Sequence, residues 1–196
     1  MFHFTADMHL GHANILRLCD RPFATITEHD DTIIKRHNEV VSDKDKVFDL
    51  GDLGFRCPAW YLAKCLEQMK GKRIVFLGNH DKPFRQAWQK GLFRDLIKNN
   101  KLEVVGGETA IEDYTLSIFK MLNIDGQKAF VGHYALRTWP NAFRGAWHLY
   151  GHSHGNLKDP FFKSFDVGVD SHNFYPWSEH EIKERMTEIE NHFQED

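Results

Sequence analysis

With 196 residues, 41% of them hydrophobic and 27% charged, the chain has the size and composition of one globular domain spanning residues 1–196, and no apolar run approaches the ~18 residues that a membrane-spanning helix needs. Its formal net charge of -3 gives no general attraction to nucleic acid, although it leaves room for a local basic groove. Three cysteines without Cys-x-x-Cys spacing are typical of free thiols in a reducing compartment, so we expect a cytoplasmic protein without a membrane partner.

The first half of the chain alternates between strand-like and helix-like segments. Strands are predicted at residues 1–6, 46–50 and 73–77, and helices at residues 11–19, 27–41 and 58–69. Thr27 could cap the second helix, and Pro58 suits the first turn of the third. Strands that alternate with helices in this way indicate a parallel sheet.

The second half of the chain is richer in strand-like segments. Short helices are predicted at residues 85–89 and 93–98, and strands at residues 102–105, 110–119, 121–124, 128–131, 146–150 and 164–169, with a hairpin turn at Asp125-Gly126. The last segment, residues 178–193, has the capping box of a helix at Ser178 and Glu181. Its apolar stripe, which includes Ile182 and Met186, is expected to pack in the core.

Five of the predicted strands end in turns rich in carboxylate, amide and imidazole groups. The turns are Asp7-Met8-His9, Asp49-Leu50-Gly51-Asp52, Gly78-Asn79-His80-Asp81, Gly132-His133 and Gly151-His152-Ser153-His154. Alternate residues of an extended segment point to the same side, so Asp-x-His and His-x-His can each present two ligands to one cation. Most of these turns would be unremarkable alone, since an Asp after a strand often caps a helix. Ligands collect past the carboxyl ends of strands in open α/β sheets, so the turns together predict a metal site.

In their order along the chain, D-x-H, G-D, G-N-H-D, G-H and G-H-x-H, these turns resemble the five sequence blocks of the calcineurin-like metallophosphoesterase superfamily, from Asp7 to His154. Residues 9–15, 21–23 and 133–139 are similar to a compact group of bacterial and phage members. The resemblance implies an α/β fold, a four-layer α/β/β/α sandwich of two mixed sheets flanked by helices. That architecture agrees with the parallel first half and the strand-rich second half.

The resemblance also implies two divalent metal ions that share Asp52. One ion would be held by Asp7, His9, Asp52 and His154, and the other by Asp52, Asn79, His133 and His152. Nitrogen and oxygen ligands without cysteine suit Mn²⁺, Fe or Zn²⁺, with Ni²⁺ a further option, and Mn²⁺ is the ion in frequent use in the superfamily.

The implied activity is hydrolysis of phosphate esters, diesters ahead of monoesters, by a hydroxide that bridges the two cations. His80 is then the candidate acid for the leaving group, with Asp81 orienting its ring. Arg137 is a candidate phosphate contact, for which a surface salt bridge is an equal alternative. His12 is expected to be structural, and His172 is left outside the metal set.

Two other functions fit the same turns. A noncatalytic scaffold that binds partners would not need His80, which binds no metal in this scheme. A nuclease would need a basic path beside the site, whereas the main basic cluster, residues 70–73, lies at the opposite end of its strand. A phosphate ester, nucleotides included, is therefore the expected partner, and the sequence does not determine the oligomeric state.

Overall fold

The computed structural model describes residues 1–117, 119–157 and 162–190. A five-stranded sheet carries the first three polar turns. Strands β1 (Phe2–Thr5), β2 (Lys46–Asp49), β3 (Lys72–Val75) and β4 (Leu102–Val104) lie in the order β4-β3-β2-β1 and are all parallel, as predicted for the first three. Thr5 pairs with Asp49, and Asp49 with Val75, so the carboxyl ends of these three strands are level. A short strand that was not predicted, β9 (Trp177–Ser178), pairs antiparallel with β1.

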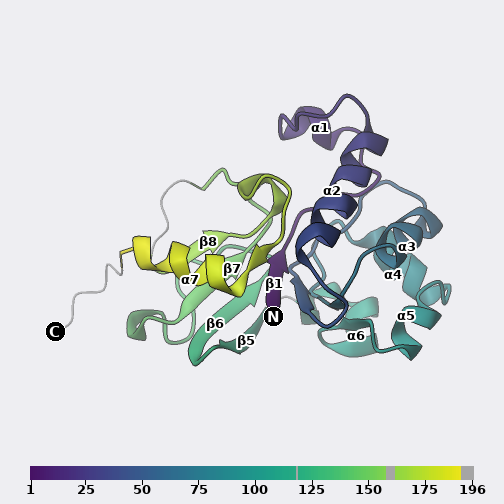
Figure 1. The fold of residues 1–196 in the computed structure, drawn as a ribbon. Helices are drawn as coiled ribbons and strands as arrows, with labels where there is room; N and C mark the ends of the chain where they lie inside the picture. Colours follow the sequence, from purple (N-terminus) through teal and green to yellow (C-terminus); the bar gives the residue numbers. More distant parts are fainter. Residues whose placement is uncertain (118, 158–161, 191–196) are drawn as a thin grey trace.

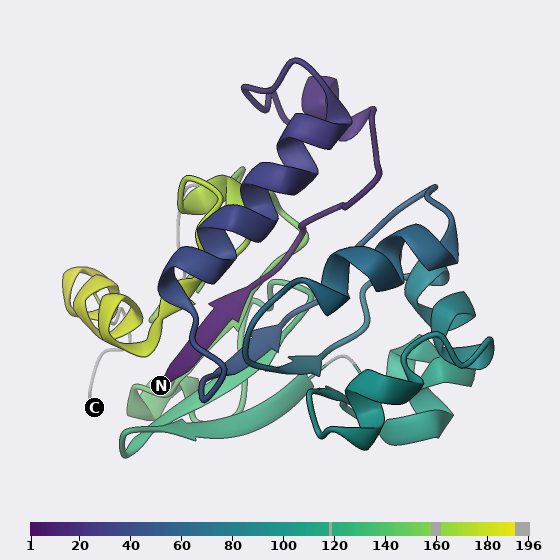
Figure 2. The same ribbon diagram turned by 45° about the vertical axis from the view of Figure 1, so that its right-hand side comes forward.

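Six helices lie between these strands or follow β4 in the chain. They are α1 (Ile15–Leu18), α2 (Ile26–Val40), α3 (Ala59–Glu67), α4 (Lys82–Gln89), α5 (Arg94–Lys98) and α6 (Gly107–Glu112). Thr25, rather than the expected Thr27, caps α2, because its side chain accepts the Glu28 N–H at 3.1 Å. Helix α2 runs along β1, while α3 to α6 gather together beside β3 (Figures 1 and 2).

A second, four-stranded sheet carries the other two polar turns. It contains β5 (Phe119–Ile124), β6 (Gln127–Gly132), β7 (Trp147–Tyr150) and β8 (Ser164–Asp166) in sequence order. The predicted hairpin at Asp125-Gly126 joins β5 to β6, and both turn residues have positive φ. Strands β6, β7 and β8 are parallel, so the protein is an α/β fold with two mixed sheets flanked by helices.

Apolar residues alternate along the strands and fill the space between the two sheets. Phe76 and Leu149 point into this space, and Ile182 and Met186 from α7 (Glu179–Glu188) join them, as the predicted stripe required. The outer face of the second sheet has a thinner cover than the expected helical layer. There Phe130 packs against the segment around Trp139 and the 3-10 helix η2 (Ala142–Arg144).

Residues 110–119 depart most from the prediction. Residues 110–117 form the end of α6 and a 3-10 helix, η1 (Tyr114–Ser117), and β5 begins at Phe119, while residue 118 lies outside the described residues. Ala110 and Ile111 are neighbours in sequence and both are buried in the core that contains Phe84 of α4. A helix can direct both side chains to that core, whereas a strand would point them to opposite faces.

The last helix starts where it was predicted to start. The Ser178 and Glu181 capping box is present, and the helix ends at Glu188, while the predicted Phe193 lies outside the described residues. A 3-10 turn, η3 (Val169–Ser171), precedes β9. The three cysteines are free thiols, and among the described residues no helix combines the length and apolar character that crossing a membrane would require.

Candidate metal centre

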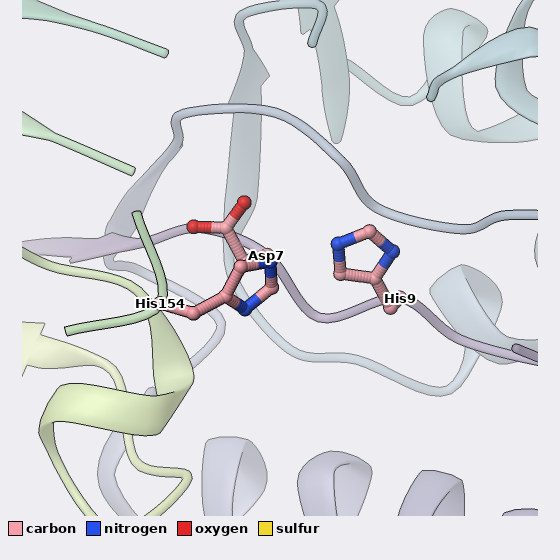
Figure 3. Close-up of side chains that lie close together, drawn as sticks. All are labelled: Asp7, His9 and His154. Carbon is pink, nitrogen blue, oxygen red and sulfur yellow. The ribbon is translucent and has the colours of Figure 1, made fainter. Parts of the chain in front are cut away.

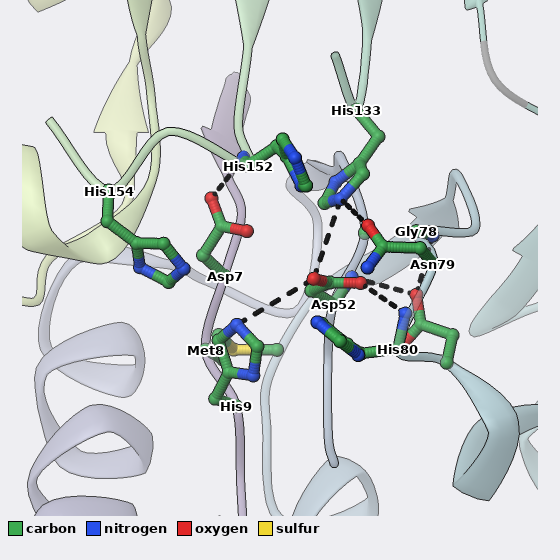
Figure 4. A network of polar contacts seen from close by, with 12 residues as sticks. Asp7, Met8, His9, Asp52, Gly78, Asn79, His80, His133, His152 and His154 are labelled. Atoms are coloured by element: carbon green, nitrogen blue, oxygen red, sulfur yellow. Dashed lines mark hydrogen bonds and ion pairs between the residues drawn. The ribbon is translucent and has the colours of Figure 1, made fainter. Parts of the chain in front are cut away.

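The five polar turns meet at one place, where the carboxyl ends of strands from both sheets approach each other (Figure 4). Five residues of these turns have left-handed backbone conformations: Asp7, His9, Asp52, His152 and His154, with φ between 48° and 66°. Such a conformation costs about 1–3 kcal/mol at a residue other than glycine and is concentrated at functional sites. The surrounding fold therefore holds these turns in shapes that the chain alone would avoid.

The first group of candidate ligands contains Asp7, His9 and His154, whose ligand atoms lie within 4.8 Å of one another (Figure 3). Asp7 is fully buried, and its Oδ2 accepts the His152 N–H at 2.7 Å. Within the described structure, Asp7 Oδ1 and both ring nitrogens of His9 have no hydrogen-bond partner. Unpaired buried polar atoms are rare, and the unpaired Asp7 oxygen together with one unpaired ring nitrogen of His9 fits a cation. Burial raises the pKa of Asp7 to about 7 and lowers that of His9 far below its ordinary value.

The second group contains Asp52, His133 and His152, whose ligand atoms also lie within 4.8 Å of one another. The His133 Nδ1–H donates to the Leu50 carbonyl at 2.8 Å, which leaves Nε2 as the ligand nitrogen. That atom lies 3.2 Å from Asn79 Oδ1 and 3.5 Å from Asp52 Oδ2. Burial opposes a charge on the ring, but the Asp52 carboxylate overcomes it and raises the pKa of His133 to about 9.

Asp52 lies between the two groups. Its Oδ2 is 3.7 Å from His9 Nε2 and 3.5 Å from His133 Nε2, with the two rings on either side of the carboxylate (Figure 4). Its Oδ1 accepts the His80 N–H at 2.8 Å, which fixes the orientation of the carboxylate. One carboxylate thus faces the ligands of both groups.

The turns of Asp52 and Asn79 approach each other too closely for a side chain at Gly78. A Cβ at that position would lie 2.2 Å from Asp52 Oδ1 and 2.8 Å from His133 Cε1. Glycine is therefore needed here because of close approach and not because of an unusual φ.

Asp81 occupies a different role from the one the sequence predicted. Its carboxylate accepts the backbone N–H groups of Asp52 at 2.8 Å, Leu53 at 2.7 Å and Gly78 at 2.8 Å. In the described structure no hydrogen bond joins it to the ring of His80. Both oxygens of Asp81 are directed to backbone donors, so it ties two ligand-bearing turns together instead of orienting the imidazole.

The ring of the half-buried His80 belongs to neither ligand group. It lies beside His9, with ring centroids 5.7 Å apart, and against Phe55, at 4.2 Å. Arg137 is exposed on the segment after β6. His172 stacks on Trp177 with ring centroids 3.9 Å apart and belongs to none of the ligand groups among the described residues.

Two residues of the site were missed in the sequence. The Asp170 carboxylate accepts a hydrogen bond from His154 Nδ1 at 2.7 Å, and Arg21 pairs with the same carboxylate at 2.7 Å. Burial opposes a charge on His154, but this contact raises its pKa to about 10. In the sequence, Arg21 stood out only as part of the segment 21–23, which is similar to the compact bacterial and phage group. Nothing in the sequence pointed to Asp170, which is 149 residues away from Arg21.

No family model matches the chain. It is 31% identical over 183 residues to the uncharacterized protein MJ1445 of Methanocaldococcus jannaschii, an alignment that covers 90% of this chain and 85% of that protein. It is 27% identical over 210 residues to the Gene 66 protein of Mycobacterium phage D29, with 95% of this chain and 96% of the phage protein covered.

Among solved structures, the protein of unknown function AQ665 from Aquifex aeolicus has the same fold, with a TM-score of 0.66, 19% identity, and 94% of this chain and 98% of that chain covered. A novel archaeal phosphodiesterase gives a TM-score of 0.47 at 17% identity, over 85% and 82% of the two chains, a likeness too distant to bear on function. Because 31% identity extends over most of both proteins, the chain belongs to the family of the Methanocaldococcus jannaschii protein MJ1445.

Proposed function

We propose that the protein is a metal-dependent phosphoesterase of the calcineurin-like metallophosphoesterase type, with two divalent cations that share Asp52. The observation that carries this proposal is the position of Asp52 Oδ2, between His9 of the first ligand group and His133 of the second. A carboxylate that faces two sets of imidazole nitrogens and oxygen atoms is suited to bridge two cations.

The residues present fit such ions. The unpaired Asp7 oxygen and one unpaired ring nitrogen of His9 offer lone pairs to a cation. The donor set of oxygen and nitrogen favours Mn²⁺, Fe, Zn²⁺ or Ni²⁺, of which we propose Mn²⁺. Two bound cations would lower the pKa of a water molecule and neutralise charge on a phosphoryl group. Asp7, His9 and His154 would hold one ion, Asn79, His133 and His152 the other, and Asp52 both.

His80 is the proposed general acid. Its backbone N–H is fixed by Asp52, which places the imidazole at the edge of the ligand groups without making it a ligand. From there it can donate a proton to the leaving alkoxide of an ester, a contribution typically worth ~10²–10⁴ in rate. Arg137 is the proposed contact for a nonbridging phosphate oxygen.

The preferred substrate class is a phosphodiester, with nucleotides included. A nuclease is less well supported, because the basic cluster at residues 70–73 lies at the amino end of β3, where Arg73 is buried in an ion pair with Asp49. A noncatalytic scaffold does not account for a ring at the position of His80.

The proposal is tested with metal-stripped protein to which Mn²⁺, Ni²⁺ or Zn²⁺ is restored in turn. Phenyl and p-nitrophenyl phosphodiesters and monoesters serve as substrates. His80→Ala is expected to slow the phenyl esters by roughly 10²–10⁴ and the p-nitrophenyl esters much less, because p-nitrophenolate leaves without a proton. His180→Ala, which changes an exposed histidine of α7, is the matched control.

Turnover that no metal restores on either ester would overturn the phosphoesterase proposal in favour of the scaffold. Equal rates for His80→Ala and the wild type on the phenyl esters would remove His80 as the acid and leave the metal site in place.

A further inference from the structure

The guanidinium of Arg21 uses all of its N–H groups inside the protein. Nε and Nη2 donate to the two carboxylate oxygens of Asp170 at 2.8 and 2.7 Å. Nη2 also donates to the carbonyl of Asp7 at 2.7 Å, and Nη1 donates to the carbonyl of Met8 at 3.0 Å and to His29 Nε2 at 2.7 Å. The Arg21 side chain is completely buried. A buried charge with every donor paired is a specific structural device and not a surface salt bridge.

The contacts of Arg21 continue into the helices. Arg21 always donates, so His29 Nε2 accepts and its Nδ1–H donates to Asp30 Oδ1 at 2.7 Å. Asp30 Oδ2 in turn accepts the Gly11 N–H at 2.8 Å and the Tyr61 hydroxyl at 2.7 Å. We call Arg21, His29, Asp30 and Asp170 the Arg21 network; it joins α2 to the loop that follows β1 and to η3.

The Arg21 network reaches the first ligand group at two points. Asp170 Oδ2 accepts the His154 Nδ1–H at 2.7 Å, which leaves Nε2 of that ring to face Asp7 and His9. A carboxylate on the far nitrogen fixes the tautomer and orientation of a ligand histidine. At the second point, the Asp7 and Met8 carbonyls that Arg21 binds belong to the turn in which Asp7 and His9 are left-handed, at φ 57° and 51°.

Those two carbonyls explain why arginine is needed. A left-handed turn cannot pair its carbonyls in a regular sheet ladder, and buried carbonyls without donors are strongly unfavourable. The planar fork of one guanidinium can reach both carbonyls and the Asp170 carboxylate together, whereas the ammonium of a lysine presents a single donor centre.

We propose that Arg21 and Asp170 are positioning residues for the first cation site. Arg21 holds the Asp7–His9 turn in its left-handed form, and Arg21 and Asp170 together orient His154. This inference rests on the proposed function in taking Asp7, His9 and His154 as cation ligands. It adds that affinity for one of the two ions is set by residues that do not touch either ion.

The test is the number and affinity of bound Mn²⁺ ions in Arg21→Lys and Asp170→Asn, measured by titration calorimetry and elemental analysis. We expect the wild type to bind two ions, and each variant to keep one at wild-type affinity while it binds the other roughly 10–100-fold more weakly. Ile182→Ala, buried in the core between the sheets, is the control for general destabilisation and is expected to keep both ions.

Two unweakened ions in both variants would overturn the inference, as would equal weakening of both ions. If the variants fail to fold, the wild type loaded with Zn²⁺ supplies the test by long-range ¹H–¹⁵N spectra of its histidines. His154 must then show a protonated Nδ1 and a metal-bound Nε2, and the opposite arrangement overturns the inference.

The inference and the proposed function can fail separately. A wild type that binds two ions but hydrolyses no ester would contradict the phosphoesterase proposal alone. Normal hydrolysis with unchanged ion binding in Arg21→Lys and Asp170→Asn would contradict the positioning role alone. A wild type that binds no ion would contradict both.

Discussion

Asp81→Asn tests whether Asp81 ties two site turns together. An asparagine keeps one oxygen, which can still accept the Asp52 and Gly78 N–H groups now bound by Oδ2. Its amide NH₂ then faces the Leu53 N–H, which loses its acceptor at Oδ1. A buried unsatisfied donor costs about 1–3 kcal/mol, and removal of the charge weakens the two remaining bonds, so we expect a loss of about 2–4 kcal/mol in the free energy of unfolding.

For a chain of this length each kcal/mol shifts the melting temperature by roughly 2–4 °C, so Asp81→Asn should melt roughly 5–15 °C below the wild type. The measurement is thermal and urea unfolding of the metal-free protein, followed by circular dichroism, so that altered metal binding does not contribute. Asp43→Asn is the matched control, because the exposed Asp43 pairs with the exposed Lys101 and such a surface pair contributes little, so the variant should melt like the wild type.

A melting temperature of Asp81→Asn equal to that of the wild type would refute the assigned role. The same variant separates this role from the one predicted from the sequence. If Asp81 binds the backbone of the turns and not the His80 ring, its replacement leaves the pKa of the general acid unchanged. The limb of the pH–rate profile that depends on this acid then lies at the same pH in the variant and in the wild type. A shift of this limb to another pH would instead support the predicted role of Asp81 in orienting the His80 ring.

Three further changes have defined outcomes. Gly78→Ala would press a Cβ onto Asp52 Oδ1, so calorimetry should show Mn²⁺ affinity reduced by roughly 10–100-fold. Burial raises the pKa of Asp7 to about 7, and a cation must displace that proton, so Mn²⁺ affinity measured from pH 5 to 8 should fall at least about tenfold for each unit below 7. The stability of the metal-free protein should depend on pH in the opposite direction to Mn²⁺ affinity. A carboxyl whose pKa is raised in the folded state stabilises the fold at low pH, and this contribution is lost as the pH rises from about 4 to about 7. Ile182→Ala should lower the free energy of unfolding by about 2–5 kcal/mol in urea and leave the number of bound ions unchanged.

Features that depend on neighbouring residues could be predicted from the sequence. Alternation of strands and helices predicted that β1, β2 and β3 are parallel, the Asp125-Gly126 pair predicted the hairpin, and Ser178 with Glu181 predicted the start of α7. Short-range signals suffice there because turn and cap preferences act within a few residues. Polar turns at strand ends also indicated where ligands would collect, since strand direction determines which ends meet.

The way in which those turns work together depends on contacts between distant segments of the fold. Ala110 and Ile111 adopt a helix because α4 offers them one buried face, a preference absent from their own segment. Asp81 could have faced His80 by sequence distance, but the approach of the Asp52 turn supplies three backbone donors that occupy it. Arg21 and Asp170 meet across 149 positions of the chain, and no local pattern encodes a contact between segments that only folding brings together.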